Sequence, residues 1–446
     1  MHSRPLRDEW KMMETTTCTE FTEDGFMAFL QSRQEPDWLV AMRKQAWSTF
    51  GQLAWPARNE EEWRRTDIRL FKLDQYTLAS ETDQALPAPM LSSGVDLGGH
   101  CISMDGVTRE SCLADDLASR GVIFGNLADV CRQHGDLIRP HLMARAVDPQ
   151  FDRFAALHAA FWSSGCVLYV PRGVVIDRPL HNFAAMSDGG SDLGHTLVIL
   201  EEGAEATLLS ETASPGEQAG GFNCGAVELI VGDNAHLRYV NLQDWGQGVW
   251  QFGQQKAVVG KDASIQWTVG ALGARLSKVN QHVVLAGEGA NSQVNGVMFT
   301  EHKQHQSLHT LQHHVAPHCT SDFLYKAALQ DSSRTVWRGM IKVDPGAQKT
   351  DGYQRNDNLL LSTRARADSI PGLEIEADDV RCTHGSTSGR VDEELIFYAC
   401  SRGFTRTEAI QMIVTGFFQK VFDRITIDNV RDALGLAIAR RVREYH

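Results

Sequence analysis

The stretch EEGAEATLL, residues 201–209, is the first of several similar segments that recur along the chain and indicate its fold. A turn of glycine and charged residues comes first, then an alanine, then alternating polar and apolar residues. Four further copies share this pattern: GDNAHLRYV (232–240), GKDASIQWT (260–268), GEGANSQVN (287–295) and DPGAQKTDG (344–352). A period of this length is the signature of a repeat architecture.

The alanines of the copies set the period. They are Ala204, Ala235, Ala263, Ala290 and Ala347, and the first three intervals between them are nearly equal. The last interval is close to two periods, which predicts a missing copy near Cys319 in PHCTSDFLY. Further outward, Val174 lies about one period before the first alanine, and Val380 lies about one period after the last.

Each period has room for two short strands and their turns, and no helical pattern separates the periods. A propeller blade of four strands needs a longer stretch of chain than one period provides, which disfavours a propeller. Stacked coils require a turn at one place per period, so a parallel β-helix is the best interpretation. We expect a mainly β protein with a mainly helical N-terminal region (1–164), a β-helix core (165–390) and a C-terminal helical domain (391–446). The opening segment, 1–20, has no pattern and is expected to be unstructured.

Helical patterns occur on both sides of the repeats. Between residues 24 and 50, apolar residues recur at steps of three and four, which is typical of a helix. After the repeats, Thr405 and Glu408 form a T-x-x-E capping box before an apolar run. That run is apolar on more faces than one contact requires. Two helices in this place serve either as a cap for the solenoid end or as a docking platform.

The amino-acid composition limits the classes of partner and of cellular location that we expect. Hydrophobic residues make up 42% and charged residues 22% of the 446 residues, as in soluble globular proteins. The net charge of −13 argues against nucleic acid or an anionic membrane as the main partner. The start has no apolar leader region, and no run is long enough to cross a bilayer. We therefore expect a cytoplasmic protein.

The number and spacing of the cysteines argue against disulfides and against a closed zinc site. The nine cysteines are odd in number and scattered, and no CxxC pair exists. The sequence also lacks the GxxxxGK[ST] loop, the GxSxG elbow and a GxGxxG turn after a strand. The chain is therefore not expected to hydrolyse ATP itself.

Two enzyme-like alternatives remain open. The acidic segments EIEADD (374–379) and DEE (392–394) are compatible with a β-helix carbohydrate-active enzyme. The segment 301–318 contains six histidines: His302, His305, His309, His313, His314 and His318. Neutral imidazoles are common metal ligands, but no HExxH motif or obvious third ligand accompanies them. A histidine-cluster metalloprotein is the second alternative.

The segment VRCTHGSTSG (380–389) is the remaining candidate for chemistry. On a strand, Cys382 and His384 point to the same face. A histidine beside a thiol can lower the pKa of the thiol and favour the thiolate, which holds iron, zinc or sulfur. One cysteine and one histidine are too few for a closed site, so they would be half of a site completed by another chain. The alternative is a buried cysteine near a hydrogen-bonded histidine.

Long motifs resemble the SufB/SufD family of iron–sulfur cluster assembly proteins. In the C-terminal half they are NDNLLLS (356–362), SIPGLEIEADDVRCTHGSTSGRVDEELIFYACSRGF (369–404) and TEAIQMIVTGFF (407–418). Upstream they are EEEWRRTDI (60–68), PRGVVIDRPL (171–180), HHVAPHCTSDFLYK (313–326) and RGMIKVDPGAQKTDGYQ (338–354). The chain resembles the SufD side of the family: Asn356 stands where SufB-type sequences carry a cysteine, and His384 where they carry a glutamate.

This resemblance implies a right-handed parallel β-helix and a scaffold subunit rather than an enzyme. It implies pairing with a SufB subunit through the β-helix end, or a homodimer where SufB is absent. It also implies a SufC ATPase, which binds the ATP, on the C-terminal helices. No cofactor is expected on the isolated chain, only a transient cluster or iron at the SufB interface. His384 would be a ligand shared with the partner chain, and Cys382 a sulfur relay or a buried neighbour.

The resemblance also selects residues for the contact with SufC. We expect the entry to the C-terminal helix and its apolar stripe to take part: Arg402, Gly403, Thr405, Glu408, Ile413, Phe417 and Phe418.

Overall fold

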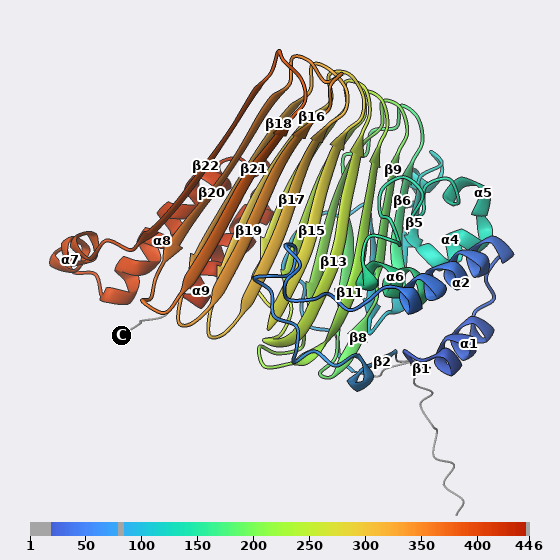
Figure 1. Ribbon diagram of the computed structural model, residues 1–446, viewed down its shortest axis with the longest axis horizontal. Coiled ribbons are helices and arrows are strands. Elements are labelled where there is room, and N and C mark those ends of the chain that lie inside the picture. Colours follow the sequence, from blue (N-terminus) through green and yellow to red (C-terminus); the bar gives the residue numbers. More distant parts are fainter. Residues whose placement is uncertain (1–18, 79–83, 443–446) are drawn as a thin grey trace, which may run out of the picture.

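The computed structural model describes residues 19–78 and 84–442 and shows one long solenoid with helices at both ends (Figure 1). Strands make up 41% and helices 22% of the chain, so the protein is mainly β. The strands form a parallel β-solenoid of about eight turns. The predicted fold class is therefore confirmed. The expected unstructured start lies outside the described residues, except that Thr19–Glu20 form the short strand β1, paired with β2 (Thr77–Leu78).

Two sheets of stacked strands face each other across the interior of the solenoid, which we call the lumen. The strands of sheet I, from the covered end to the open end, are β4 (Val107–Leu113), β3 (Gly99–Met104), β7 (Leu180–Ala185), β10 (Glu205–Ala213), β12 (His236–Asp244), β14 (Ser264–Ala271), β16 (Asn291–Thr300), β18 (Thr320–Leu329), β20 (Asp351–Leu360) and β22 (Arg381–Arg390). Successive coils add strands in parallel and in register, because one period of sequence makes one coil.

Sheet II contains the other strand of each coil. In the same direction its strands are β5 (Ile123–Asn126), β6 (Gly165–Val170), β9 (His195–Leu200), β11 (Gly220–Val231), β13 (Gly248–Val259), β15 (Leu276–Leu285), β17 (His305–His314), β19 (Arg334–Val343) and β21 (Arg366–Ile375), and the short β8 (Gly190–Asp192) pairs with β11. The last strands of both sheets, β21 and β22, end the solenoid.

The repeated alanines are corner residues of the coils. Six corner residues are at most 1% exposed: Ala204, Ala235, Ala263, Ala290, Cys319 and Ala347. The predicted missing copy at Cys319 is therefore confirmed, since Cys319 directly precedes β18. In five coils the residue before the corner has a positive φ: Gly203, Asn234, Asp262, Gly289 and His318. Glycine, asparagine and aspartate enter this left-handed region most easily, which explains the composition of the repeated turn.

The N-terminal helices cover the outer face of sheet II (Figure 1). They are α1 (Glu23–Ser32), α2 (Asp37–Gln52), the 3-10 turn η1 (Leu73–Gln75), α4 (Leu127–Gln133), α5 (Gly135–Ile138) and α6 (Arg153–Phe161). The short α3 (Asp115–Ala118) instead lies at the covered end, where Leu117 joins the apolar core of the lumen. Helix α6 is buried from Phe154 to Phe161 and packs on β11 and β13. Phe154 of α6 stacks on Phe252 of β13 with ring centroids 3.7 Å apart.

The sheets begin earlier than the expected boundary at residue 165. Strands β3, β4 and β5 come from the region expected to be mainly helical, and they extend sheets I and II at the covered end. Asp105 and Gly106, both with positive φ, turn β3 into β4. An Asp-Gly pair between alternating polar and apolar residues is a strong hairpin signal. The β3–β4 hairpin could therefore have been predicted from the sequence.

The C-terminal helices α7 (Glu393–Ser401), α8 (Arg406–Phe422) and α9 (Asp428–Arg441) follow directly after β22. Helices α8 and α9 pack on the outer face of sheet I, where Val414 and Leu434 join Val297 and Leu324 in one buried cluster. The predicted capping box is present at the start of α8. Within the described part of the chain, no helix combines the length and apolar character needed to cross a bilayer.

Candidate functional site

The end of the solenoid at β21 and β22 is open (Figure 1). Among the described residues, each of these strands pairs with a neighbour on one side only, β21 with β19 and β22 with β20. Residues of β22 are mostly exposed, and Leu373 and Ile375 of β21 are about two-fifths exposed at 39% and 40%. An open strand edge presents unpaired backbone N–H and C=O groups, which is a template for pairing with another chain.

His384 lies at the mouth of the lumen. It is the register partner of Gln354 on β20. The Gln354 side chain is fully buried in the lumen, where its amide donates to Gly339 O (3.2 Å) and Gly372 O (3.1 Å) on sheet II. Register partners on parallel strands share a face, so His384 also faces the lumen. No further coil follows, and His384 is exposed.

Cys382 shares this face two residues earlier and is half-buried. It packs against a small apolar cluster that includes Ile341, Val343 and Ala347. Burial raises the pKa of the Cys382 thiol above its ordinary value. The expectation that the neighbouring histidine lowers this pKa is therefore not met, because desolvation of the thiolate outweighs other influences.

Asn356 lies one coil inside the mouth and is fully buried. Its Oδ1 accepts hydrogen bonds from Asn358 Nδ2 (2.8 Å) and from the Ser369 hydroxyl. Asn358 Nδ2 also approaches Ser388 Oγ at 3.2 Å, which links the last two coils. The register partner of Asn356 is Ser386, two residues after His384. The structure thus brings Asn356 and His384 to neighbouring strands, with Asn356 beneath the surface.

The C-terminal helices carry a second exposed surface. Helix α7 lies beyond the last strands of the solenoid, at its open end (Figure 1). Five large apolar residues of α7, the following turn and α8 are exposed: Leu395 (53%), Phe397 (74%), Tyr398 (59%), Phe404 (42%) and Met412 (53%). We call this set the α7 patch. These five residues fall within 395–412, and a concentration of exposed apolar residues of this kind indicates an interaction site.

The residues expected at the SufC contact are divided between this surface and the core. Arg402 stacks on Tyr398 with 5.1 Å between the guanidinium carbon and the ring centroid. Gly403 has φ +97° and turns the chain from α7 into the capping box. Ile413 and Phe417 are half-buried. Phe418 is fully buried against sheet I. It therefore holds α8 on the solenoid and is not part of the exposed surface.

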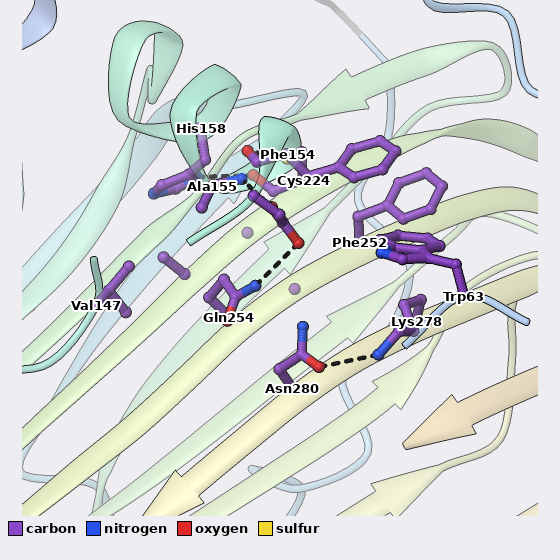
Figure 2. A pocket seen from close by; sticks show the side chains of 14 residues that line it. Trp63, Val147, Phe154, Ala155, His158, Cys224, Phe252, Gln254, Lys278 and Asn280 are labelled. Atoms are coloured by element: carbon purple, nitrogen blue, oxygen red, sulfur yellow. Dashed lines mark hydrogen bonds between the residues drawn. The ribbon is translucent and has the colours of Figure 1, made fainter. Parts of the chain in front are cut away.

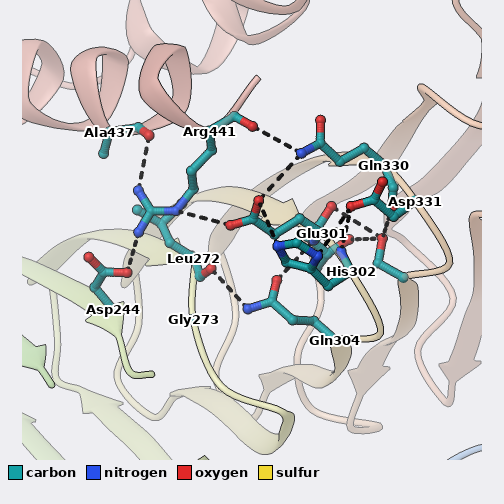
Figure 3. A network of polar contacts seen from close by, with 12 residues as sticks. Asp244, Leu272, Gly273, Glu301, His302, Gln304, Gln330, Asp331, Ala437 and Arg441 are labelled. Atoms are coloured by element: carbon teal, nitrogen blue, oxygen red, sulfur yellow. Dashed lines mark hydrogen bonds and ion pairs between the residues drawn. The ribbon is translucent and has the colours of Figure 1, made fainter. Parts of the chain in front are cut away.

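Arg441 anchors the C-terminal helices to the solenoid (Figure 3). Its guanidinium pairs with Asp244 at the end of β12 and lies 4.0 Å from Glu301 Oε1. Gln330 Nε2 donates to Arg441 O at 2.9 Å. Lys326 Nζ of β18 donates to Phe417 O at 2.6 Å. The helices therefore contact several successive coils through polar groups as well as through the apolar cluster.

The histidines of segment 301–318 do not converge. His305, His309 and His313 lie on the outer face of β17, four residues and therefore about 13 Å apart from one to the next. His309 Nδ1 contacts Glu62 Oε2 at 2.6 Å, whereas His314 faces the lumen and contacts Ser321 Oγ at 2.8 Å. Among residues 19–78 and 84–442 there is no group of three or more His, Cys, Asp or Glu side chains placed to hold a metal ion. The metalloprotein alternative is not favoured.

A small pocket lies where the N-terminal segment crosses sheet II (Figure 2). Lys278 Nζ donates to Asn280 Oδ1 at 2.9 Å, and Gln254 Nε2 lies 3.4 Å from Asp152 Oδ2. Burial lowers the pKa of Lys278 to about 7. The enclosed space is about 10 Å³, which holds one water molecule at most. The pocket is part of the packing between the N-terminal region and the solenoid.

The fold and the open end define the class of protein: a two-sheeted parallel β-solenoid with an uncapped polar mouth and an appended helical surface. Residues 183–417 match the family model described as SUF system FeS cluster assembly, SufBD core domain. Residues 27–181 match the model of the SufBD protein N-terminal region. The chain belongs to the SufBD family of iron–sulfur cluster assembly proteins.

Curated relatives agree with this assignment. The chain is 27% identical to the iron-sulfur cluster assembly protein SufD of Bacillus subtilis over 443 residues, 97% of this chain and 100% of the relative. It is 29% identical to SufB of the same organism over 311 residues, 69% of this chain and 66% of the relative. A SufBD family protein of Staphylococcus epidermidis is 27% identical over 89% of this chain and 88% of its own.

Proposed function

We propose that the chain is a SufD-type scaffold subunit that assembles iron–sulfur clusters together with a SufB-type subunit and a SufC-type ATPase. Alignment coverage supports the SufD assignment, because the chain aligns along the whole SufD relative but along two thirds of the SufB relative. The residues support it too: Asn356 and His384 follow the SufD pattern in the sequence resemblance.

The open end of the solenoid is the observation that carries the proposal. Strands β21 and β22 each have a free edge. A second solenoid of the same family has edges with the same strand spacing, so backbone hydrogen bonds can continue from one chain into the next. We place the SufB-type partner here, and a second copy of this chain where that partner is absent.

His384 is the ligand that this chain offers at the interface. An imidazole nitrogen can bind iron directly or accept a proton. His384 is exposed and faces the mouth of the lumen, while the Cys382 thiol beside it is half-buried with a raised pKa. The nascent cluster, which is the cargo, therefore takes one ligand from His384 and the remaining ligands from the partner.

The α7 patch is the docking surface for the ATPase. Its five apolar residues are held on a helix pair that is fixed by the capping box and by the Arg406–Glu393 ion pair (2.8 Å). ATP binds the partner, since this chain has no phosphate-binding loop.

The test is co-expression with SufB- and SufC-type partners, comparing wild type with His384→Ala and Thr383→Ala. Thr383 is the exposed neighbour on the opposite face of β22 and serves as the matched control. We expect all three complexes to form, and bound iron and sulfide to be lost only in His384→Ala. Equal iron and sulfide in the His384→Ala complex would overturn the ligand role, and failure of the wild-type complex to form would overturn the scaffold assignment.

A further inference from the structure

The lumen contains a polar cavity of about 70 Å³ near its covered end. It lies between the sheets, where Asn182 Nδ2 of sheet I approaches Thr196 Oγ1 of sheet II at 3.4 Å. Its lining is rich in hydroxyl and amide groups, among them Ser103, Ser164, Asn182, Thr196, Ser210 and Asn223. A polar cavity of this size is filled by water or by a small polar species rather than left empty.

Asp192, at the end of β8, places a carboxylate in this cavity. It is 2% exposed, and its Oδ2 accepts a hydrogen bond from Asn223 Nδ2 at 2.8 Å. Its Oδ1 makes no hydrogen bond of good geometry within the described part of the chain. Burial raises the pKa of Asp192 to about 6, although the Asn223 side chain and the Gly194 amide act to lower it. Both oxygens lie 3.3–3.4 Å from the position that a Cβ would occupy on Gly194, so the absence of a side chain there leaves room for the carboxylate.

The charge of Asp192 has no cationic side chain beside it. No lysine or arginine is among the described residues that line the cavity, and Asp192 is their one carboxylate. His195 also lines it, but its ring nitrogens contact His158 and Glu228 at 2.9 and 3.1 Å. A buried unpaired carboxylate is strongly unfavourable, so a positive charge must come from a bound species or the group must be neutral.

Ser164 supplies a second unsatisfied group. Its Oγ is buried, lines the cavity and has no hydrogen-bond partner among the described residues. The amide of His195 donates to Ser164 O at 3.1 Å, which places Ser164, directly before β6, beside the residues that precede β9. The Asp192 carboxylate and the Ser164 hydroxyl offer oxygen ligands, which suit hard cations of the alkali and alkaline-earth groups. One carboxylate balances one positive charge.

We propose that this cavity binds a monovalent metal cation of the sodium or potassium class, with Asp192 as its charged ligand and the Ser164 hydroxyl as a neutral ligand. The cation joins β8 to the first coils of both sheets and stabilises the covered end of the solenoid. This site is independent of the function proposed for the open end.

The first test compares the thermal midpoint of the full chain in potassium chloride and in choline chloride at equal concentration, about 150 mM, so that screening is the same. Choline is too large for the cavity. We expect potassium to raise the midpoint by about 2 °C or more. The rise should vanish in Asp192→Asn and shrink in Ser164→Ala. It should persist in Asp177→Asn, which removes an exposed carboxylate and is the charge-matched control.

The second test uses crystals of the wild-type chain grown with a thallium(I) salt, which needs no variant to fold. An anomalous peak beside Asp192 supports the site. No peak in the cavity, together with equal midpoints in potassium and choline, would overturn the proposal and show that water and a proton neutralise Asp192.

Discussion

Gln354 and His384 are register partners on β20 and β22, yet Gln354 is fully buried and His384 is exposed. The difference arises because a coil lies beyond Gln354 and none lies beyond His384. The same lumen-facing position is therefore structural in one coil and accessible in the next. At the open end, Gln354 therefore contributes to the stability of the fold, whereas His384 is available to a partner.

The two positions should respond differently to truncation. Gln354→Ala leaves the carbonyl groups of Gly339 and Gly372 without their donor, and we expect the free energy of unfolding to fall by about 1–3 kcal/mol. His384→Ala should change it by less than about 0.5 kcal/mol, as for other surface positions. Urea unfolding of both variants measures this. Equal losses would mean that His384 is packed as firmly as Gln354.

Acid should destabilise the contact between α6 and sheet II. His158 is buried, with Nδ1 2.7 Å from Cys224 O and Nε2 2.9 Å from His195 Nδ1, and burial lowers its pKa to about 3. The unfolded chain titrates this group near 6.5 and therefore binds more protons between pH 6.5 and 3. Stability consequently falls as the pH decreases through this window, by up to about 1.4 kcal/mol per pH unit.

The variant His158→Gln has no titrating ring at this position but keeps a donor and an acceptor. The slope of unfolding free energy against pH should be smaller in this variant than in wild type between pH 6 and about 4. Parallel slopes would show that other groups dominate the acid response.

Arg441 should control how firmly α9 is held on the solenoid. Arg441→Gln leaves Asp244 and Glu301 without their shared cation, and we expect opening of α9 to become easier by about 1–3 kcal/mol. Hydrogen exchange of α9 amides measures this opening. Arg440→Gln, at the exposed neighbouring position, is the control and should leave exchange unchanged. Unchanged exchange in Arg441→Gln would assign the anchoring to the apolar cluster alone.

The α7 patch should govern binding of the ATPase partner. Phe397 is 74% exposed, so Phe397→Ser should leave the fold intact and weaken the complex at least about tenfold, as expected for an aromatic anchor. Leu436→Ser removes another exposed apolar side chain, on α9 (58%), and is the control. Isothermal titration with the isolated ATPase compares them. Equal affinity in the two variants would exclude the α7 patch as the docking surface.

The repeat could be found without a structure because each coil repeats the same local requirement. A residue with positive φ, such as Asn234 or Asp262, is followed by a small corner residue. This pair of residues therefore recurs in the sequence once in every period. Cys319 fits the same rule, because it is small enough for the corner. The capping box of Thr405 and Glu408 is equally local and was equally readable.

The candidate site could be predicted only in part from the sequence. Alternation along a strand placed Cys382 and His384 on one face, but their burial, and with it the raised pKa of the thiol, depends on the coil beneath them. The burial of Phe418 depends in the same way on how α8 lies against sheet I, and the exposure of Phe397 on where α7 lies beyond the last strands. No periodicity within a helix states which of its apolar residues faces a distant sheet.

Local periodicity thus specified the coils, their corners and the helical ends, since these follow from backbone conformation and spacing within a single period. That Asp192 and Ser164 line the same cavity at one end of the lumen, and that β21 and β22 have free edges at the other, follows from how the separate coils stack. The period states which coils are neighbours, but which side chains of the two sheets face each other across the lumen, and which end coil stays uncovered, is decided only when all the coils have stacked, because these contacts join residues that no single period contains.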